Sequence, residues 1–314
     1  MKAKAAPLVS LGDLVADLVV SIPHLPVEAG RHQVASDLRL SPGGSGNFLI
    51  AGARLGQPMA ALGALGADHW GQSVAEIIAA EGVDLSLVRH TGTTTVVLVL
   101  VGQAGDHVFL GKIGEAGKID LRSSEAALIR GAGALFCAGY TLCEAHQAAW
   151  AIEAMAVAQA AGVPVFFDPG PQLAAAPDEW RAAAWPLMDV LLTTEDEISL
   201  LGGGTLDEIF AVGPATIVVK RGAAGCTVYG RGQAAPIVEV AGHPVPVVDT
   251  SAAGDSFDAA FIAAWIWGWP LGACAQLANA VGAAKVQKLG GGLSVPTLAE
   301  VQAVITRFNL DLKL

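Results

Sequence analysis

The stretch DTSAAGDSFDAAF, residues 249–261, places two acids around a run of small residues and then becomes apolar. If a helix begins near Ala253, the backbone amides of Ala252, Ala253, Gly254 and Asp255 have no acceptor in the helix, and the helix dipole adds positive charge there. Small side chains let an anion approach these amides, so the stretch suits a phosphate or another oxyanion. Asp255 lies in the same turn and is placed to take a proton from a hydroxyl beside that anion.

An alternative without chemistry fits the same residues equally well. Asp249 or Ser251 would cap a buried helix, and Asp255 would only complement the helix dipole, as acids in first turns often do. The stretch alone does not separate the two interpretations.

Composition limits the class of protein. The chain has 314 residues, 53% hydrophobic and 6% aromatic, with abundant Gly and Ala, which favours helices packed closely on a sheet. A formal net charge of −11 without a basic cluster argues against nucleic acid or an anionic membrane as a partner. The four cysteines form no C-x-x-C pair, which favours reduced thiols and a cytoplasmic protein.

One segment resembles a membrane span. Residues 259–284 carry no charge and are long enough to cross a bilayer. However, Gly268, Pro270 and Gly272 lie in the middle, where a helix–turn–helix needs its break. We therefore expect two buried helices there.

Short β-branched runs alternate with Ala-rich helical stretches through most of the chain. Apolar strands joined by helices are buried on both faces, which predicts a doubly wound, mainly parallel α/β sheet. The expected strands are 7–12, 163–168, 188–194 and 215–220, and the expected helices are 47–55, 144–162 and 195–201.

Two stretches break this alternation. Residues 30–40 and 93–111 have the period of two that is typical of strands, and the second is predicted to be a hairpin turning at 102–106. We expect them in a small antiparallel sheet beside the main one. Ligands of open parallel sheets bind at the carboxyl ends of the strands, which directs attention to Asp17, Asp168, Glu197 and residues 249–257.

Two common nucleotide motifs do not apply. GRGQAA, residues 230–235, fits G-x-G-x-x-A but precedes an expected strand instead of a helix, and the G-x-x-x-x-G-K-[ST] pattern does not occur. The sequence therefore does not support a dinucleotide fingerprint or a P-loop.

The stretch DTSAAGDSF resembles the D-T-x-G-A-G-D-x-F signature of the ribokinase-like, or PfkB, carbohydrate kinases, with Ala252 in place of the first Gly. Six further segments resemble elements of that family in the family's order: LGDLVAD, PGGSGNFLIAGARLG, LGALGADHWG, FFDPGPQ, TTEDEISLLGG and VVKRGAAG. Together these elements span residues 11–257. The resemblance thus covers nearly the whole chain.

The resemblance implies a single ribokinase-like domain over residues 1–314, with a lid formed by about 13–43 and 93–112 that often makes a dimer interface. It implies an ATP-dependent kinase that transfers the γ-phosphoryl group to a primary hydroxyl of a small sugar. Asp255 would be the catalytic base, and Ala252, Ala253 and Gly254 would supply the amides of the anion hole. The sugar hydroxyls would bind Asp17, Asn47 and a neighbouring glycine, since a carboxylate and an amide offer both donors and acceptors.

The resemblance also implies how the nucleotide and its ions are held. ATP would be lined by Thr194, Lys220, Gly222, Gly225 and Asn279. Glu197, with Asp168, would organise Mg²⁺ through water. Asp249 and Ser251 match positions that help many members of the family hold a monovalent cation, such as K⁺.

The sequence departs from the family pattern at several positions. Thr194 replaces an Asn, and the glycine pair lies one residue closer to Asn47, so the sugar-contacting glycine is either Gly43 or Gly44. In FFDPGPQ, the expected Asn and Arg are missing, and Pro169 and Pro171 stiffen the loop instead. At Ala252 we predict a negative φ, because a positive φ would cost Ala roughly 1 kcal/mol relative to Gly.

Two alternatives remain at this level. A nucleoside kinase of the same fold would use Phe48 and Phe109 to stack on a base, although both are also explained as hydrophobic packing. A sensor that binds a sugar or nucleotide without catalysis would keep the fold, but the combination of Asp255, Asn47 and Asp17 argues against it. The sequence does not name the sugar, the oligomeric state or a K⁺ requirement.

Overall fold

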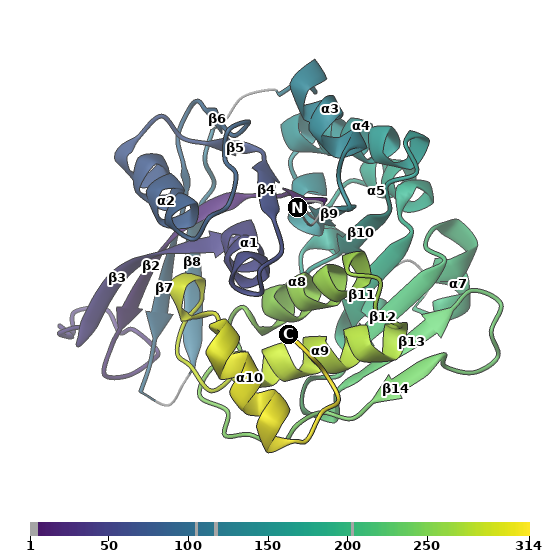
Figure 1. The fold of residues 1–314 in the computed structure, drawn as a ribbon. Coiled ribbons are helices and arrows are strands. Elements are labelled where there is room, and N and C mark those ends of the chain that lie inside the picture. Colours follow the sequence, from purple (N-terminus) through teal and green to yellow (C-terminus); the bar gives the residue numbers. More distant parts are fainter. Residues whose placement is uncertain (1–5, 104–105, 116–118, 202–203) are drawn as a thin grey trace.

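The computed structural model describes residues 6–103, 106–115, 119–201 and 204–314. Within these residues the main sheet has eight strands in the order β14-β13-β12-β11-β10-β9-β1-β4 (Figure 1). All pairs from β12 to β4 are parallel, and β13 and β14 add an antiparallel edge. The bounds are β1 Leu8–Leu11, β4 Met59–Leu62, β9 Ala134–Ala138, β10 Val165–Asp168, β11 Val190–Thr194, β12 Thr216–Lys220, β13 Cys226–Gly230 and β14 Val238–Val240.

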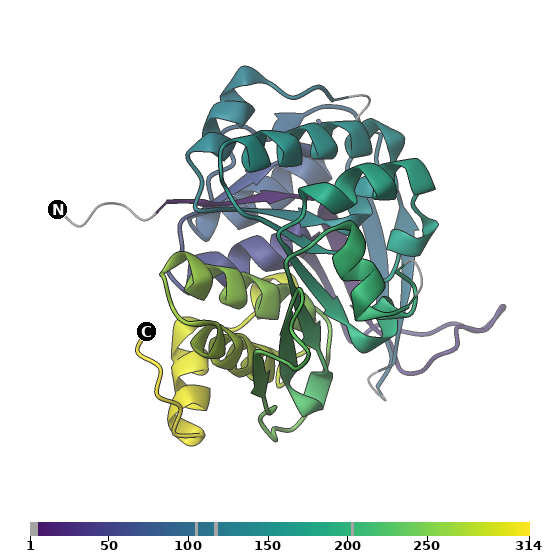
Figure 2. The ribbon, with the colours of Figure 1, turned by 90° about the vertical axis from the view of Figure 1, so that its right-hand side faces the viewer.

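Helices cover both faces of this sheet, as the continuous apolar strands predict. One core lies on the side of α1 Ser45–Arg54, α2 His69–Ala80, α8 Ala253–Ile266, α9 Leu271–Lys285 and α10 Leu298–Arg307. The other lies on the side of α3 Ser123–Arg130, α4 Ala145–Ala160, α5 Asp178–Ala184 and α7 Leu206–Val212. Figure 2 shows the sheet between α4 and α5 on one face and α8 and α9 on the other. The expected doubly wound α/β fold is confirmed.

Short elements complete the chain. They are β5 Ala64–Leu65, β6 Arg89–His90, α6 Glu195–Ile198 and the 3₁₀ turns η1 Gly139–Leu142, η2 Leu173–Ala175, η3 Trp185–Leu187, η4 Gly222–Ala224 and η5 Gly292–Ser294. The helix expected at 195–201 is therefore shorter than predicted, because α6 ends at Ile198.

A second sheet stands beside the first (Figure 1). Its order is β3-β2-β7-β8, with β2 Leu14–Ser21, β3 Asp37–Gly44, β7 Thr95–Val101 and β8 His107–Lys112. The predicted hairpin is confirmed, since β7 and β8 pair antiparallel. The β2–β3 pair is also antiparallel, whereas the central β2–β7 pair is parallel. We call this second sheet the lid sheet.

The strand expected at 30–40 is wrong over its first part. Pairing of β3 with β2 begins only at Asp37, opposite Ser21. Beyond Ser21 the chain contains Pro23 and Pro26, which have no amide to donate to a neighbouring strand, so the ladder ends there.

The uncharged segment 259–284 forms two helices, as predicted. Helix α8 ends at Ile266 and α9 begins at Leu271, and the residues between them include Gly268 with φ 79°. In the part of the chain that the structure describes, no helix has the length and apolarity needed to span a bilayer.

Ala252, the residue before α8, does not have the backbone conformation that we predicted for it. Ala252 has φ 59° and ψ 12°, in the left-handed region, so the expectation of a negative φ was wrong. The chain has to turn sharply here: Ala253 N donates to Thr250 O at 3.1 Å, and Ser256 N donates to Ala252 O at 3.0 Å. The turn therefore keeps the backbone conformation that glycine adopts most easily, and alanine bears a strain of about 1 kcal/mol that the surrounding fold offsets.

We expect Ala252→Gly to stabilise the protein by up to about 1 kcal/mol, because glycine adopts the left-handed conformation without strain. Part of this gain is offset, since glycine also increases the conformational entropy of the unfolded chain. Denaturant unfolding of the two proteins measures this difference. Ala127→Gly, an exposed position inside α3, is the matched control and should destabilise by about 0.5–1 kcal/mol. Equal destabilisation by both substitutions would contradict the strain at Ala252.

Candidate active site

The candidate site centres on a hydrogen bond between two helices on the same face of the sheet. Asn47, in the first turn of α1, donates from Nδ2 to Oδ2 of Asp255 at 2.9 Å, across 208 residues of sequence. Gly292 N donates to Oδ1 of Asn47 at 2.6 Å, which fixes the orientation of the amide. The predicted base and the predicted sugar-binding amide therefore lie side by side.

The carboxyl group of Asp255 holds its proton more strongly than an ordinary Asp. Burial and the Asp168 carboxylate raise the pKa of Asp255, and Asn47, Lys220 and Lys285 lower it, which leaves the pKa at about 6. A group with this pKa is a carboxylate at neutral pH yet basic enough to accept a proton from a reacting hydroxyl.

Asp17, on β2 of the lid sheet, faces the same space. Burial, together with the charge of Asp255, raises the pKa of Asp17 to about 7. Asp255 thus ionises first, and its negative charge helps Asp17 to keep a proton. Two neighbouring carboxyl groups with separated pKa values can offer one acceptor and one donor to a polyhydroxyl ligand.

The structure distinguishes the two candidate glycines. A Cβ atom at Gly43 would overlap the carboxylate of Asp17, so only a glycine lets the backbone lie against this side chain. Gly44 has φ 53° and precedes α1, and a Cβ there would meet the carbonyl oxygen of Asp13 at 2.6 Å instead. Gly43 is therefore the glycine that lies beside Asp17.

The start of α8 offers amides beside these carboxylates. Ala253 N is used within the turn, but the amides of Gly254 and Asp255 find no protein acceptor among the described residues. A Cβ at Gly254 would lie 3.7 Å from Lys220 Nζ, so an ammonium group stands next to this helix end. Free amides, the helix dipole and a nearby cation together favour an anion.

Lys220 belongs to a buried ionic triad. Its Nζ lies 2.7 Å from Oδ2 of Asp168 at the end of β10 and 3.1 Å from Oδ2 of Asp258 on α8. Burial raises the pKa of Asp258 well above its ordinary value. Burial acts in the same direction on Asp168, but the charge of Lys220 and the hydrogen bonds to Asp168 outweigh it, so the pKa of Asp168 lies below its ordinary value. One proton on Asp258 leaves a buried Lys220–Asp168 ion pair with no net charge, which suits the interior.

Sequence reasoning missed Asp258 and assigned Lys220 only to the nucleotide. Asp258 is fully buried, and every residue that follows it in α8 is apolar. A carboxyl group in such a setting requires a partner, and this signal was present in the sequence one turn after Gly254. The partner itself, on a strand 38 residues earlier, follows only from the fold.

Glu197 is held by a capping box at the start of α6. Thr194 N donates to Oε2 of Glu197 at 2.8 Å, and Glu197 N donates to Oγ1 of Thr194 at 3.2 Å. The Thr in place of the family's Asn therefore caps the helix and orients the carboxylate. Both described hydrogen-bond donors to this carboxylate, Thr194 N and Thr193 Oγ1, contact Oε2, so Oε1 could accept from a water molecule bound to a metal. Among the described side chains, no group of three or more His, Cys, Asp or Glu could hold a metal ion.

Asp168 fits that role less well than Glu197. Gly170 N donates to its Oδ1 at 2.8 Å, and Lys220 occupies its Oδ2. Both oxygens already have protein partners.

Three of the five residues expected at the nucleotide, Gly222, Gly225 and Asn279, lie together around the end of β14. Gly222 has φ 53° and Gly225 has φ 96°, and a Cβ at Gly225 would overlap the Val240 carbonyl oxygen. Asn279 on α9 donates to that same carbonyl at 3.2 Å and to Ala241 O at 3.3 Å. The β12–β13 turn, the end of β14 and α9 thus meet at one place.

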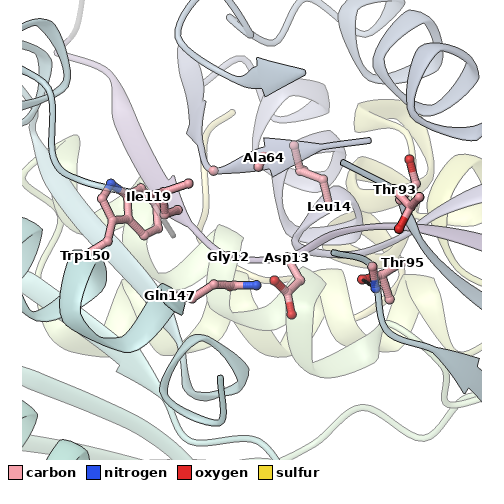
Figure 3. Close-up of a pocket in the computed structure, with 12 residues that line it drawn as sticks. Gly12, Asp13, Leu14, Ala64, Thr93, Thr95, Ile119, Gln147 and Trp150 are labelled. Atoms are coloured by element: carbon pink, nitrogen blue, oxygen red, sulfur yellow. Dashed lines mark hydrogen bonds between the residues drawn. The ribbon is translucent and has the colours of Figure 1, made fainter. Parts of the chain in front are cut away.

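A pocket lies where the two sheets join (Figure 3). It is lined by the Gly12–Asp13 connection from β1 to β2, by residues 93–95 where β7 begins, and by Gln147 and Trp150 of α4. Figure 3 shows the Gln147 amide pointing toward Asp13. None of the residues predicted for the site lines this pocket.

Comparison with known proteins supports one family. The model of the pfkB family carbohydrate kinases matches residues 6–298. A ribokinase of Arabidopsis thaliana is 29% identical over 320 residues, covering 96% of this chain and 81% of that protein. A probable fructokinase-7 of the same plant is 29% identical over 273 residues, covering 80% of this chain and 76% of its own.

Among solved structures, Arabidopsis thaliana ribokinase complexed with ribose and ATP has a TM-score of 0.81 and 28% identity. The similarity covers 96% of this chain and 99% of that one. Because the family model spans nearly the whole sequence and the fold agrees from end to end, the chain belongs to the pfkB family of carbohydrate kinases.

Proposed function

We propose that this kinase transfers the γ-phosphoryl group of ATP to a primary hydroxyl of a small sugar, with Asp255 as the general base. The hydrogen bond from Asn47 to a half-buried Asp255 beside the free amides of α8 carries the proposal. It places a proton acceptor, a hydroxyl-binding amide and an anion-binding helix end in one small space.

The sugar would lie between β2 and α1, with hydroxyl groups on Asp17 and Asn47 and with the reacting hydroxyl on Asp255. As its oxygen forms a bond to the γ-phosphorus, Asp255 accepts the hydroxyl proton and the bond to the β,γ-bridging oxygen breaks, which releases ADP. The amides at Gly254 and Asp255 would stabilise the charge on the transferred group. Position and charge supply most of the catalysis.

Mg²⁺ bound to ATP would neutralise phosphate charge, with Glu197 holding it through water. Lys220 and Asp168 would support the same region through their ion pair. The adenine of ATP would be lined by Gly222, Gly225 and Asn279.

The structure gives an observation against a nucleoside as the acceptor. Phe48 is fully buried and stacks on Phe136 with ring centroids 4.0 Å apart, so it is not free to stack on a base. Phe109, on β8 of the lid sheet, is 55% exposed. Because Phe48, one of the two residues expected to stack on a nucleoside base, is not available, we favour a ribose- or fructose-type sugar.

We propose that the lid sheet closes over the sugar and that its outer face, with the exposed Leu38 and Leu110, meets a second copy of the chain. A cytoplasmic location fits the four cysteines, all of which are free thiols in the structure.

Replacement of the base should abolish most turnover. Ribose, fructose, adenosine and inosine are first screened with ATP and Mg²⁺ for ADP release, and the best acceptor is then used. We expect Asp255→Asn and Asp255→Ala to lower kcat by ~10²–10⁴-fold, because the proton then has no acceptor. Asp207→Asn, an exposed acid on α7, is the control and should retain activity. Near-normal turnover by Asp255→Asn would refute the mechanism.

The pH profile should report the raised pKa of Asp255. Below about 6 this carboxyl group is protonated and cannot act as a base, so kcat/KM should fall tenfold per pH unit on the acid side and level off above pH 7. The measurement runs from pH 4.5 to 9, with samples held at each pH and returned to pH 7.5 to exclude denaturation. If the midpoint of the fall in kcat/KM lies near pH 4, the reacting group is an ordinary exposed carboxylate.

Closure of the lid should be visible without catalysis. Saturating sugar alone should slow amide hydrogen exchange in β2, β3 and β7 and in residues 93–95 at the pocket between the sheets, since closed strands open less often. Exchange in α10, remote from the sugar, is the internal control. Unchanged exchange in the lid sheet at a sugar concentration shown to bind would argue against closure.

A further inference from the structure

The last residue of α9 is a lysine without access to solvent. Lys285 is 0% exposed, and its Nζ donates to the carbonyl oxygens of Asp249 at 3.2 Å and Lys288 at 3.1 Å. A buried ammonium group is costly unless acceptors and negative charge surround it. Here the two carbonyl oxygens, the carboxylate of Asp249 and the carboxyl end of a helix provide them.

These contacts lie at the positions that resemble a monovalent cation site. The Asp249 carboxylate has both oxygens engaged by the protein: Oδ1 accepts from N and Oγ of Ser251, each at 2.8 Å, and Oδ2 accepts from Gly290 N at 2.6 Å. The carbonyl of Asp249 is taken by Lys285. The oxygens that a K⁺ ion would need therefore already have donors.

Charge leads to the same conclusion. Lys285 Nζ lies 3.2 Å from the carbonyl oxygen of Asp249, so a K⁺ ion bound to the oxygens of this loop would be a close neighbour of the ammonium. Two neighbouring cations repel strongly where water is excluded. The residues present thus do not fit a monovalent cation.

We propose that the Lys285 ammonium is the resident cation of the 249–251 loop, and that it makes this kinase independent of K⁺. The proposal rests on the proposed function insofar as it concerns turnover. The occupancy of the loop by a side-chain cation does not depend on which reaction the enzyme catalyses.

Lys285 would act through other residues, as a positioning residue. It joins the segment before α8 to the segment after α9, which also pair through Val248 N to Val286 O at 2.7 Å. The second segment then continues to Gly292, whose amide orients Asn47 on Asp255. Loss of the cation would therefore loosen the turn at α8 and the base together.

The first test uses the wild-type protein. Initial rates are measured in KCl, NaCl and choline chloride at equal ionic strength, and we expect them to agree within twofold. A stimulation of more than tenfold by KCl over choline chloride would overturn the proposal.

The second test moves the cation from the side chain to the solvent. Lys285→Ala removes the ammonium and leaves the carbonyl oxygens of Asp249 and Lys288 free, so we expect kcat to fall at least tenfold in choline chloride and to recover at least threefold in KCl, with a smaller change in KM. Lys288→Met removes a neighbouring, partly exposed lysine, whose side chain pairs with Glu300, and should show no cation dependence. If KCl does not restore the kcat that Lys285→Ala loses, the proposed replacement of the ammonium by K⁺ is contradicted.

Thermal unfolding in the same three salts provides a readout that needs no catalysis. KCl should raise the Tm of Lys285→Ala above its value in choline chloride, whereas wild type and Lys288→Met should show equal values. Equal Tm values for Lys285→Ala in both salts would argue against a vacated cation site, even if no sugar proves to be a substrate. If Lys285→Ala does not fold, Lys285→Ser, which also removes the ammonium and is too short to replace its contacts with the two carbonyl oxygens, takes its place and should show the same salt dependence.

Discussion

The hydrogen bond between Asn47 and Asp255 is the contact on which the candidate site depends. It joins the first turns of two helices that are far apart in sequence, and it needs both their placement on one face of the sheet and the amide of Gly292 to orient the Asn side chain. Burial of Asp255 raises its pKa and outweighs the opposite effect of the hydrogen bond from Asn47, so the packing around the group makes it more basic. Geometry and reactivity thus have one cause.

Two buried lysines keep the surrounding acids in place. Lys220 joins the end of β10 to α8 through Asp168 and Asp258, and Lys285 joins the loops on either side of α8 and α9. Each ammonium binds groups from separate segments, so the loops around the anion-binding amides are held by charge as well as by packing. Such interactions fix geometry more than they add stability, because burying both partners costs much of the Coulomb energy that they recover.

Ala252 illustrates why a local rule failed. A preference against positive φ is worth about 1 kcal/mol, which is small compared with the hydrogen bonds of Asp249, Thr250 and Ser256 that fix the turn around it. The rest of the turn was therefore able to impose the conformation on an unsuitable residue. The same argument explains the first part of the strand expected at 30–40, where the loss of donors at Pro23 and Pro26 outweighed an alternating pattern.

The sequence alone determined the α/β architecture, the two buried helices of residues 259–284, and the resemblance to carbohydrate kinases, because periodicity, breaking residues and short motifs are local properties of the chain. It also singled out Asp17 and Asp255 by residue type and position, and Asn47 through that resemblance. Only the tertiary structure decided their partners: that Gly43 lies against Asp17, that Lys220 is shared with Asp258, and that Lys285 occupies the Asp249 loop. A buried charge must be neutralised, but which distant segment supplies the opposite charge depends on how the sheet and its helices pack.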